Sequence, residues 1–158
     1  MDPMTALEAL SYIVTILGLP LGIWIFAAQQ REARQNEENA LHRELSEEYD
    51  GFLRLALENA DFQLMRGGAA QKALTEEQRE RQTILFRILV SVFEKAFIIL
   101  YDERMTEETK RLWLSWEDDM REWCARPEFR AQLGALLEGE DDLFSRHILR
   151  IAERESAR

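Results

Sequence analysis

One uncharged, apolar stretch, residues 9–28 (ALSYIVTILGLPLGIWIFAA), constrains this chain more than any other part of its sequence. It is twenty residues long and contains no Asp, Glu, Lys or Arg. Because a helix rises about 1.5 Å per residue and the core of a bilayer is about 30 Å thick, this length matches one crossing. The sequence therefore predicts an N-terminal transmembrane helix, with residues 1–28 forming a short tail and the span.

The charges that flank this stretch predict its orientation. Asp2 and Glu8 precede it with no basic residue, whereas Arg31, Arg34 and Arg43 follow it. Lys and Arg are enriched on the cytoplasmic side of membrane helices, so we expect the N-terminus outside and the rest of the chain in the cytoplasm. The expected location is a bacterial inner membrane. An acidic N-terminus disfavours a cleaved signal peptide, whose first region is basic.

Small residues recur along one face of the predicted span. Their steps of four, three and four place them on neighbouring turns of a helix: Ser11, Thr15, Gly18 and Gly22. Small side chains let two helix backbones approach closely, so we interpret this face as a surface for self-association in the lipid bilayer, giving a homo-oligomer. Two alternatives stay open: the face lines a pore, or its glycines only reflect how common glycine is in membrane helices.

The remainder of the chain is predicted to be all-α. Residues 29–40 are almost entirely polar and are interpreted as a helical juxtamembrane stalk that continues the span. Residues 41–158 carry apolar residues at helical spacing and few Gly or Pro, which favours a compact antiparallel helical bundle in the cytoplasm. We expect helices at about 41–66, closed by Gly67 and Gly68, at 76–102, and starting after Thr106, at Pro127 and after Asp141.

Two of these helix starts carry specific signals. Thr75 and Gln78 have the spacing of a capping box, in which the threonine accepts a backbone N–H and the glutamine reaches back to the cap. Asp141 is placed to cap the last helix. The apolar residues of that helix are expected to face inward: Leu143, Phe144, Ile148 and Ile151.

The charge of the chain excludes one class of partner. It holds 30 acidic and 20 basic residues, which gives a formal net charge of −10. Contact with a phosphate backbone requires concentrated positive charge, so we expect no nucleic-acid partner. Most of the basic residues are arginines, and we expect them to pair with the many carboxylates on a solvated surface. The single cysteine, Cys124, cannot form a disulfide within one chain, which suits a reducing cytoplasm.

The sequence lacks recognisable catalytic and cofactor motifs. His42 and His147 are the only histidines, and neither has the Glu-x-x-His spacing of metal sites in helical bundles. Cys124 has no CxxC partner, and no P-loop, dinucleotide-binding loop or nucleophile elbow occurs. We therefore expect no enzymatic activity, no cofactor and no metal, and we interpret His147 as a histidine at the rim of the core.

Two groups of side chains are candidates for function. The predicted helix 76–102 is apolar around most of its circumference, and its narrow polar strip contains Arg87, Ser91 and Glu94. These charges argue against a second membrane span, and we expect a partly buried strip that is either a structural network or a relay or ligand contact. The next helix places three tryptophans on one stripe, which form either core or a partner-binding face: Trp113, Trp116 and Trp123.

Residues 98–130 (IILYDERMTEETKRLWLSWEDDMREWCARPEFR) combine a Leu-Tyr helix end, an acidic turn, a Trp-x-x-Trp helix and a Pro-x-Phe turn. The predicted span and about residues 80–130, which include this segment, resemble uncharacterised bacterial single-pass membrane proteins that carry a small cytoplasmic helical domain. In layout the chain is also similar to membrane accessory proteins of type VI CRISPR systems, which assemble rings and in some cases carry a closely spaced Arg–His motif. Arg34 and His42 have seven residues between them, and Arg146 is adjacent to His147, so this second likeness implies layout alone.

These observations predict a non-enzymatic single-pass membrane protein. It self-associates through its transmembrane helix and presents an acidic helical domain to a protein partner in the membrane or cytosol, as an adaptor, regulatory or accessory subunit. The alternative is an oligomeric pore-forming effector, for example in phage defence. Association of the span is common to both hypotheses, because each requires copies that lie side by side in the bilayer.

Overall fold

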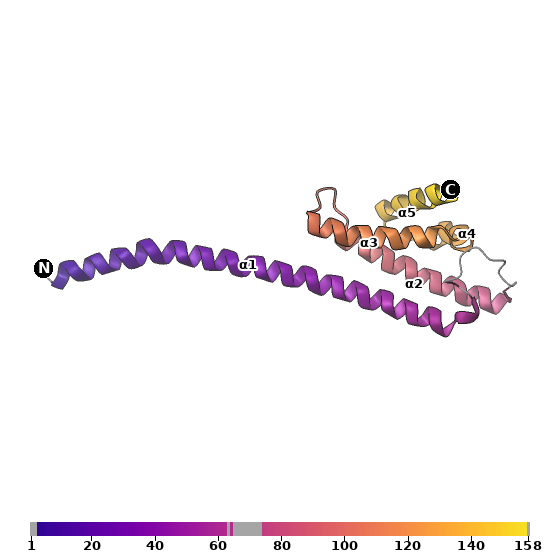
Figure 1. Ribbon diagram of the computed structural model, residues 1–158, viewed down its shortest axis with the longest axis horizontal. Coiled ribbons are helices and arrows are strands. Elements are labelled where there is room, and N and C mark those ends of the chain that lie inside the picture. Colours follow the sequence, from indigo (N-terminus) through magenta and orange to yellow (C-terminus); the bar gives the residue numbers. More distant parts are fainter. Residues whose placement is uncertain (1–2, 63, 65–73, 158) are drawn as a thin grey trace. The chain divides into compact units, whose positions relative to one another are not determined.

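The computed structural model describes the backbone of residues 3–62, 64 and 74–157, and the side chains of these residues except 3–20, 31 and 33–39. Within these ranges every regular element is a helix (Figure 1). The chain divides into two compact units, Met1–Arg43 and Glu44–Arg158. The predicted all-α class and the helical bundle are confirmed.

The first unit is the N-terminal part of one long helix, α1 (Pro3–Glu58), whose last turns belong to the second unit. The backbone of α1 is helical through the apolar stretch 9–28 and through the polar residues 29–40. In the part of the chain that the structure describes, no helix is long and apolar enough to cross a bilayer. For most of the predicted span, residues 9–20, the structure describes the backbone and not the side chains.

The end of α1 differs from the sequence-based expectation. The helix ends at Glu58 and a short 3-10 helix, η1 (Ala60–Phe62), follows, so the prediction that Gly67 and Gly68 close it is wrong. Those two glycines lie outside the described residues. The observed end has a local cause, because both the backbone N–H and the side-chain amide of Asn59 donate to the carbonyl of Leu55, at 3.2 and 2.8 Å. Asparagine satisfies free carbonyls at helix ends in this way.

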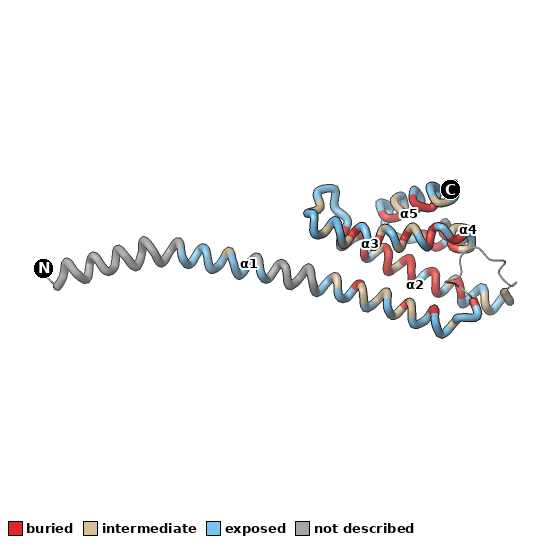
Figure 2. The backbone as a smooth tube through the Cα atoms, in the orientation of Figure 1, coloured by how far each residue is buried: buried red, intermediate tan, exposed pale blue. Residues whose placement is uncertain are grey.

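Four further helices build the bundle in the second unit. In Figure 2 the buried residues are concentrated in α2 and on one side of each of the other helices. The helices are α2 (Glu76–Leu100), α3 (Glu107–Cys124), α4 (Pro127–Leu136) and α5 (Asp142–Ser156).

Local signals set where these helices begin, as predicted. Thr75 caps α2, and both hydrogen bonds of the capping box with Gln78 are present. Thr106 caps α3 by accepting from the backbone N–H of Thr109. Pro127 occupies the first turn of α4, where its missing N–H has no cost, and Asp141 accepts two backbone N–H bonds at the start of α5.

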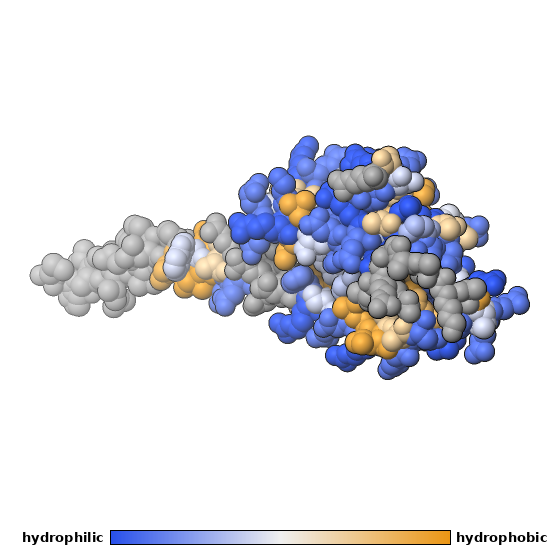
Figure 3. Space-filling view, turned by 45° about the vertical axis from the view of Figure 1, so that its right-hand side comes forward, coloured by the Kyte–Doolittle hydropathy of each residue, from blue (hydrophilic) through white to orange (hydrophobic). Residues whose placement is uncertain are grey.

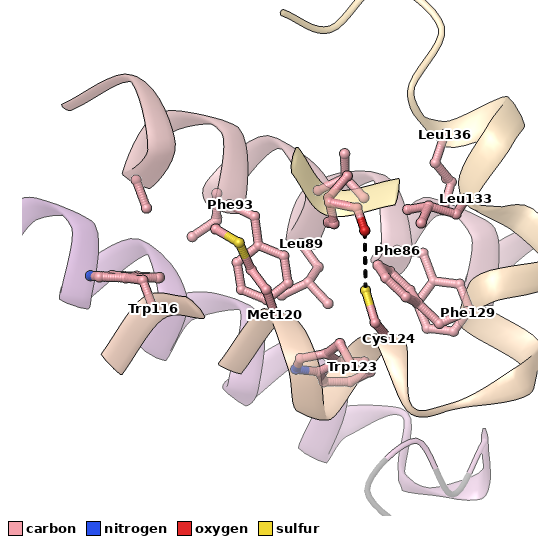
Figure 4. Packing of buried hydrophobic residues seen from close by; sticks show 14 of the residues in the cluster. Phe86, Leu89, Phe93, Trp116, Met120, Trp123, Cys124, Phe129, Leu133 and Leu136 are labelled. Carbon is pink, nitrogen blue, oxygen red and sulfur yellow. Dashed lines mark hydrogen bonds between the residues drawn. The ribbon is translucent and has the colours of Figure 1, made fainter. Parts of the chain in front are cut away.

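The core is built around α2. Phe86 and Phe93 have no exposed surface, and they lie against Met120 and Trp123 of α3 and Phe129 of α4 (Figure 4). The Phe86 and Phe129 rings meet edge to face, with their centroids 5.2 Å apart. Burying one such side chain stabilises the fold by roughly 1.5–3 kcal/mol, so α2 is the helix on which the bundle depends most.

Candidate functional site

The three tryptophans predicted as core or partner face are all buried in the second unit. Trp116 packs edge to face against Tyr49, with ring centroids 5.7 Å apart, and Trp123 donates its indole N–H to the Tyr49 hydroxyl at 3.3 Å. Trp113 contacts Phe97 and Tyr101 in the same edge-on manner. The indoles therefore belong to the core, and the stripe of α3 that carries them is not an exposed binding surface.

Residues of the predicted polar strip on α2 differ in their exposure. Arg87 is exposed, contrary to the expected partial burial, whereas Ser91 and Glu94 are half-buried. Arg87 is exposed because its side chain is long: the apolar stem can lie along neighbouring buried residues of α2 while the charged guanidinium group reaches water. The strip is therefore one of the solvent-facing parts of α2, which also exposes Ile84 and Ile98.

Glu94 connects α2 to the turn that precedes α5. Its Oε1 accepts the backbone N–H of Asp141 at 2.5 Å. Hydrogen bonding between the carboxyls of Glu140 and Glu94, partial burial and the Glu94 charge raise the pKa of Glu140 to about 7. The turn contains Gly139 at a φ of 94°, a conformation that only glycine adopts without strain. Glu94 thus positions the start of α5.

His147 of α5 lies in an aromatic setting. Its ring centroid is 5.4 Å from each of those of Phe97, Tyr101 and Trp113, and its side chain is 11% exposed. Burial lowers the pKa of His147, the charge of Glu117 opposes this shift, and the charges of nearby arginines add to it. The imidazole is consequently neutral at pH 7. Its Nε2 atom is buried without a hydrogen-bond partner and lies 3.8 Å from Oε1 of Glu117.

A small cavity of about 110 Å³ lies beside this histidine. Its walls come from the end of α2, from α3 and from α5, and we refer to it as the His147 cavity. It is lined by Tyr101, Glu117, His147, Arg150, Ile151 and Arg154.

The His147 cavity adjoins a larger open groove of about 860 Å³, and Tyr101 and Arg150 line both. Leu143 and Leu149 of α5 contribute apolar surface to the groove. The expectation that Leu143 faces inward is wrong, because this side chain is 60% exposed. One residue turns a helix by about 100°, and the inward row of α5 starts at the next residue, Phe144.

Three arginines follow one another at steps of four on α5: Arg146, Arg150 and Arg154. This spacing places them on one face of the helix. Among the residues that the structure describes, no carboxylate lies within ion-pair distance of any of the three, although Arg121 of α3 pairs with Glu117 at 3.3 Å. Pairing with carboxylates, as expected from the sequence for the arginines in general, is absent for these three over the described residues, and the step of four was the signal that could have identified this face.

Cys124 is buried beneath α5. Its Sγ lies 4.0 Å from the carbonyl oxygen of Ile148, as the dashed line in Figure 4 shows. Burial raises the pKa of the thiol to about 12, so at neutral pH it stays protonated and is a poor nucleophile. Over the described residues, no group of three or more His, Cys, Asp or Glu is arranged to hold a metal ion.

Of the predicted association face, Ser11, Thr15 and Gly18 lie outside the residues whose side chains are described, and Gly22 is exposed. The face of the molecule drawn in Figure 3 is largely hydrophilic over the bundle, with apolar side chains gathered in separate patches. Comparisons of this chain with protein-family models, with curated proteins and with solved structures found no match.

Proposed function

We propose that this chain is a non-enzymatic membrane protein, anchored in a bacterial inner membrane by one helix over residues 9–28. It self-associates through this helix and presents its helical bundle to a protein partner. One observation carries the anchoring proposal: near the end of the apolar stretch, large apolar side chains are exposed. They are Leu21 (56%), Ile23 (69%), Trp24 (70%) and Phe26 (66%).

Exposed apolar side chains close together in sequence need a covering medium. Each one costs roughly 1.5–3 kcal/mol when it stays in water instead of an apolar environment. Hydrocarbon chains of a bilayer provide such an environment, and a continuous helix satisfies its own backbone hydrogen bonds there. The helical backbone of α1 through residues 9–28 therefore supports the proposal.

Self-association rests on the small face of the same helix. Among the described residues, no atom lies within 4 Å of a Cβ atom built at Gly22, so they leave this position open. An open glycine lets a second helix approach closely, and Gly18 lies one turn earlier in the sequence. We infer that two copies of α1 pack along this face.

The proposal of a binding role, without catalysis, is supported by the state of the reactive groups in the bundle. Cys124 is a buried, protonated thiol, and Glu94 is occupied by the backbone of Asp141. A catalytic group must contact the substrate, and its pKa must suit the proton transfer or nucleophilic attack that it performs. Cys124 and Glu94 instead contact backbone atoms of the bundle.

Membrane extraction of the full-length chain tests the anchor. We expect the protein to stay with membranes after alkaline washing, and we expect Leu21→Asp with Ile23→Asp to release it, because charges are costly in hydrocarbon. Leu57→Asp is the matched control, since Leu57 is also exposed on α1 but lies in the second unit. Recovery of the unaltered chain in the soluble fraction would contradict the anchor.

Sizing the detergent-solubilised protein tests the association face. We expect an oligomer that Gly22→Ile dissociates, because the added side chain separates the two backbones. Gly134→Ile on α4 is the control, since a Cβ there also meets no atom within 4 Å. A monomeric wild-type protein would overturn the self-association. Dye leakage from liposomes that contain the protein would favour the pore-forming alternative over the adaptor.

A further inference from the structure

We propose that the His147 cavity binds a phosphate group, and that the adjoining groove holds the apolar body of the ligand that carries it. The ligand class is therefore a phosphomonoester with an uncharged apolar or aromatic part. This site lies wholly within the second unit, so the proposal does not depend on the membrane anchor.

Positive charge without a partner is the first reason. Arg150 and Arg154 line the cavity, and neither pairs with a carboxylate of the described residues, in a chain whose net charge is −10. Two planar guanidinium groups one helical turn apart can each donate paired N–H bonds to phosphate oxygens. Glu117 is the acidic residue among the described residues that line the cavity, and Arg121 offsets its charge from 3.3 Å.

The second reason is the imidazole of His147. Buried polar atoms nearly always have a hydrogen-bond partner, yet Nε2 of His147 has none among the residues that the structure describes. Protonated, this nitrogen donates to an anion in the cavity, and the anion in turn favours the protonated form. The charged and titratable groups that face it are Glu117 and Arg121 from α3, Arg150 and Arg154 from α5, and the hydroxyl of Tyr101.

The groove limits what the rest of the ligand can be. Its volume of about 860 Å³ lies within the roughly 300–1,000 Å³ typical of sites for small molecules. Phe97, Leu143 and Leu149 supply apolar surface, Asp102, Glu103 and Glu153 supply negative charge, and Arg146 and Arg150 supply positive charge. The acids outnumber the arginines, so the groove disfavours a polyphosphate or a nucleic acid and favours a ligand with one anionic end and an uncharged body.

Titration calorimetry on the full-length protein tests the site with two probes, inorganic phosphate and phenyl phosphate. We expect both to bind, and phenyl phosphate more tightly. Arg150→Gln with Arg154→Gln should weaken both by about tenfold or more, because two charge-assisted contacts are lost. Both arginines are exposed at the surface, so the variant should fold, which circular dichroism checks. Lys110→Gln with Arg111→Gln removes the same charge from exposed positions of α3 and should change nothing.

A third variant separates the cavity from the groove. Leu149→Ser should weaken phenyl phosphate and leave inorganic phosphate unchanged, because only the apolar body contacts the groove. Sulfate, whose charge does not change between pH 6 and pH 8, isolates His147. It should bind more tightly at pH 6, and His147→Gln should remove this pH dependence.

The source of the phosphate is resolved by competition. Displacement of phenyl phosphate by vesicles that contain phosphatidic acid, but not by pure phosphatidylcholine vesicles, would assign the site to a lipid headgroup. Competition by soluble phosphomonoesters alone would assign it to a free metabolite, and both results support the site. Absence of binding by either probe at millimolar concentration, or equal weakening by the control pair on α3, would overturn the proposal.

Discussion

The apolar residues near position 24 of α1 and those in the middle of α2 are alike in sequence but differ in their surroundings. Ile23 and Trp24 are mostly exposed, whereas Phe86 and Phe93 of α2 are completely buried. Glutamate and lysine side chains interrupt α2, and Lys95 pairs with Glu48 at 2.6 Å on its solvent edge, while the stretch 9–28 has no charge. A charged edge suits a helix packed among protein neighbours, and an uncharged circumference suits one surrounded by an apolar medium.

The largest effect that tests this contrast is the removal of a ring from the core. Phe93→Ala should lower the free energy of unfolding of the bundle by about 3–5 kcal/mol, because a buried aromatic leaves a cavity. Trp24→Ala should leave it unchanged, since Trp24 belongs to the other unit. Urea unfolding followed by circular dichroism measures both. A comparable loss for Trp24→Ala would show that the N-terminal stretch is part of the same core.

The fold was predictable wherever short-range chemistry decides it. Thr75, Thr106, Pro127 and Asp141 mark helix starts correctly, because each acts through hydrogen bonds or a fixed φ within its own first turn. The end of α1 was predicted at Gly67 and Gly68 because glycine is the more common signal for a helix end. The helix instead ends earlier, at Glu58, where the side chain of Asn59 donates to the carbonyl of Leu55. Leu143 was misplaced because apolar character alone does not say which side of α5 faces the core.

The candidate site was harder to predict, because its parts come from separate helices. Sequence identified His147 as a residue at the rim of the core, and its setting agrees with that interpretation. It did not connect His147 with Glu117 or Tyr101, which reach the same cavity from α3 and from the end of α2. The proximity of Glu94 and Glu140 likewise depends on the conformation of the turn around Gly139. That conformation depends on how α4 and α5 pack, and no local sequence motif predicts it.

A smaller effect tests whether α2 carries its own start signal, as a helix within a protein core should. Thr75→Ala removes the side chain that accepts the N–H of Gln78 at 3.2 Å and should cost about 1 kcal/mol of stability. Thr75→Ser keeps the hydroxyl and should recover most of this loss. Urea midpoints of the two variants measure the difference. Equal losses for alanine and serine would show that the methyl group, and not the cap, is responsible.

The smallest effect concerns the polar edge of α2, where Glu94 bonds to Glu140. Folding raises the pKa of Glu140 to about 7 from an ordinary value of 4.5, so the folded state favours its protonated form. This contribution is fully present below about pH 4.5 and is lost as the pH rises through about 7. Because Glu140 is largely open to solvent, screening should limit it to less than about 1 kcal/mol.

His147 contributes with the opposite sign, since its pKa is lowered and the stability it contributes is gained as the pH rises. Comparison of urea midpoints at pH 5 and pH 8 therefore needs a variant that isolates Glu140. Glu140→Gln should remove the loss of stability toward pH 8, so the urea midpoint of this variant should be higher than that of the wild type at pH 8. Glu138→Gln, at an exposed position of the same turn, is the control and should have the pH profile of the wild type. Parallel pH profiles for wild type and Glu140→Gln would mean that the two carboxyls share no proton.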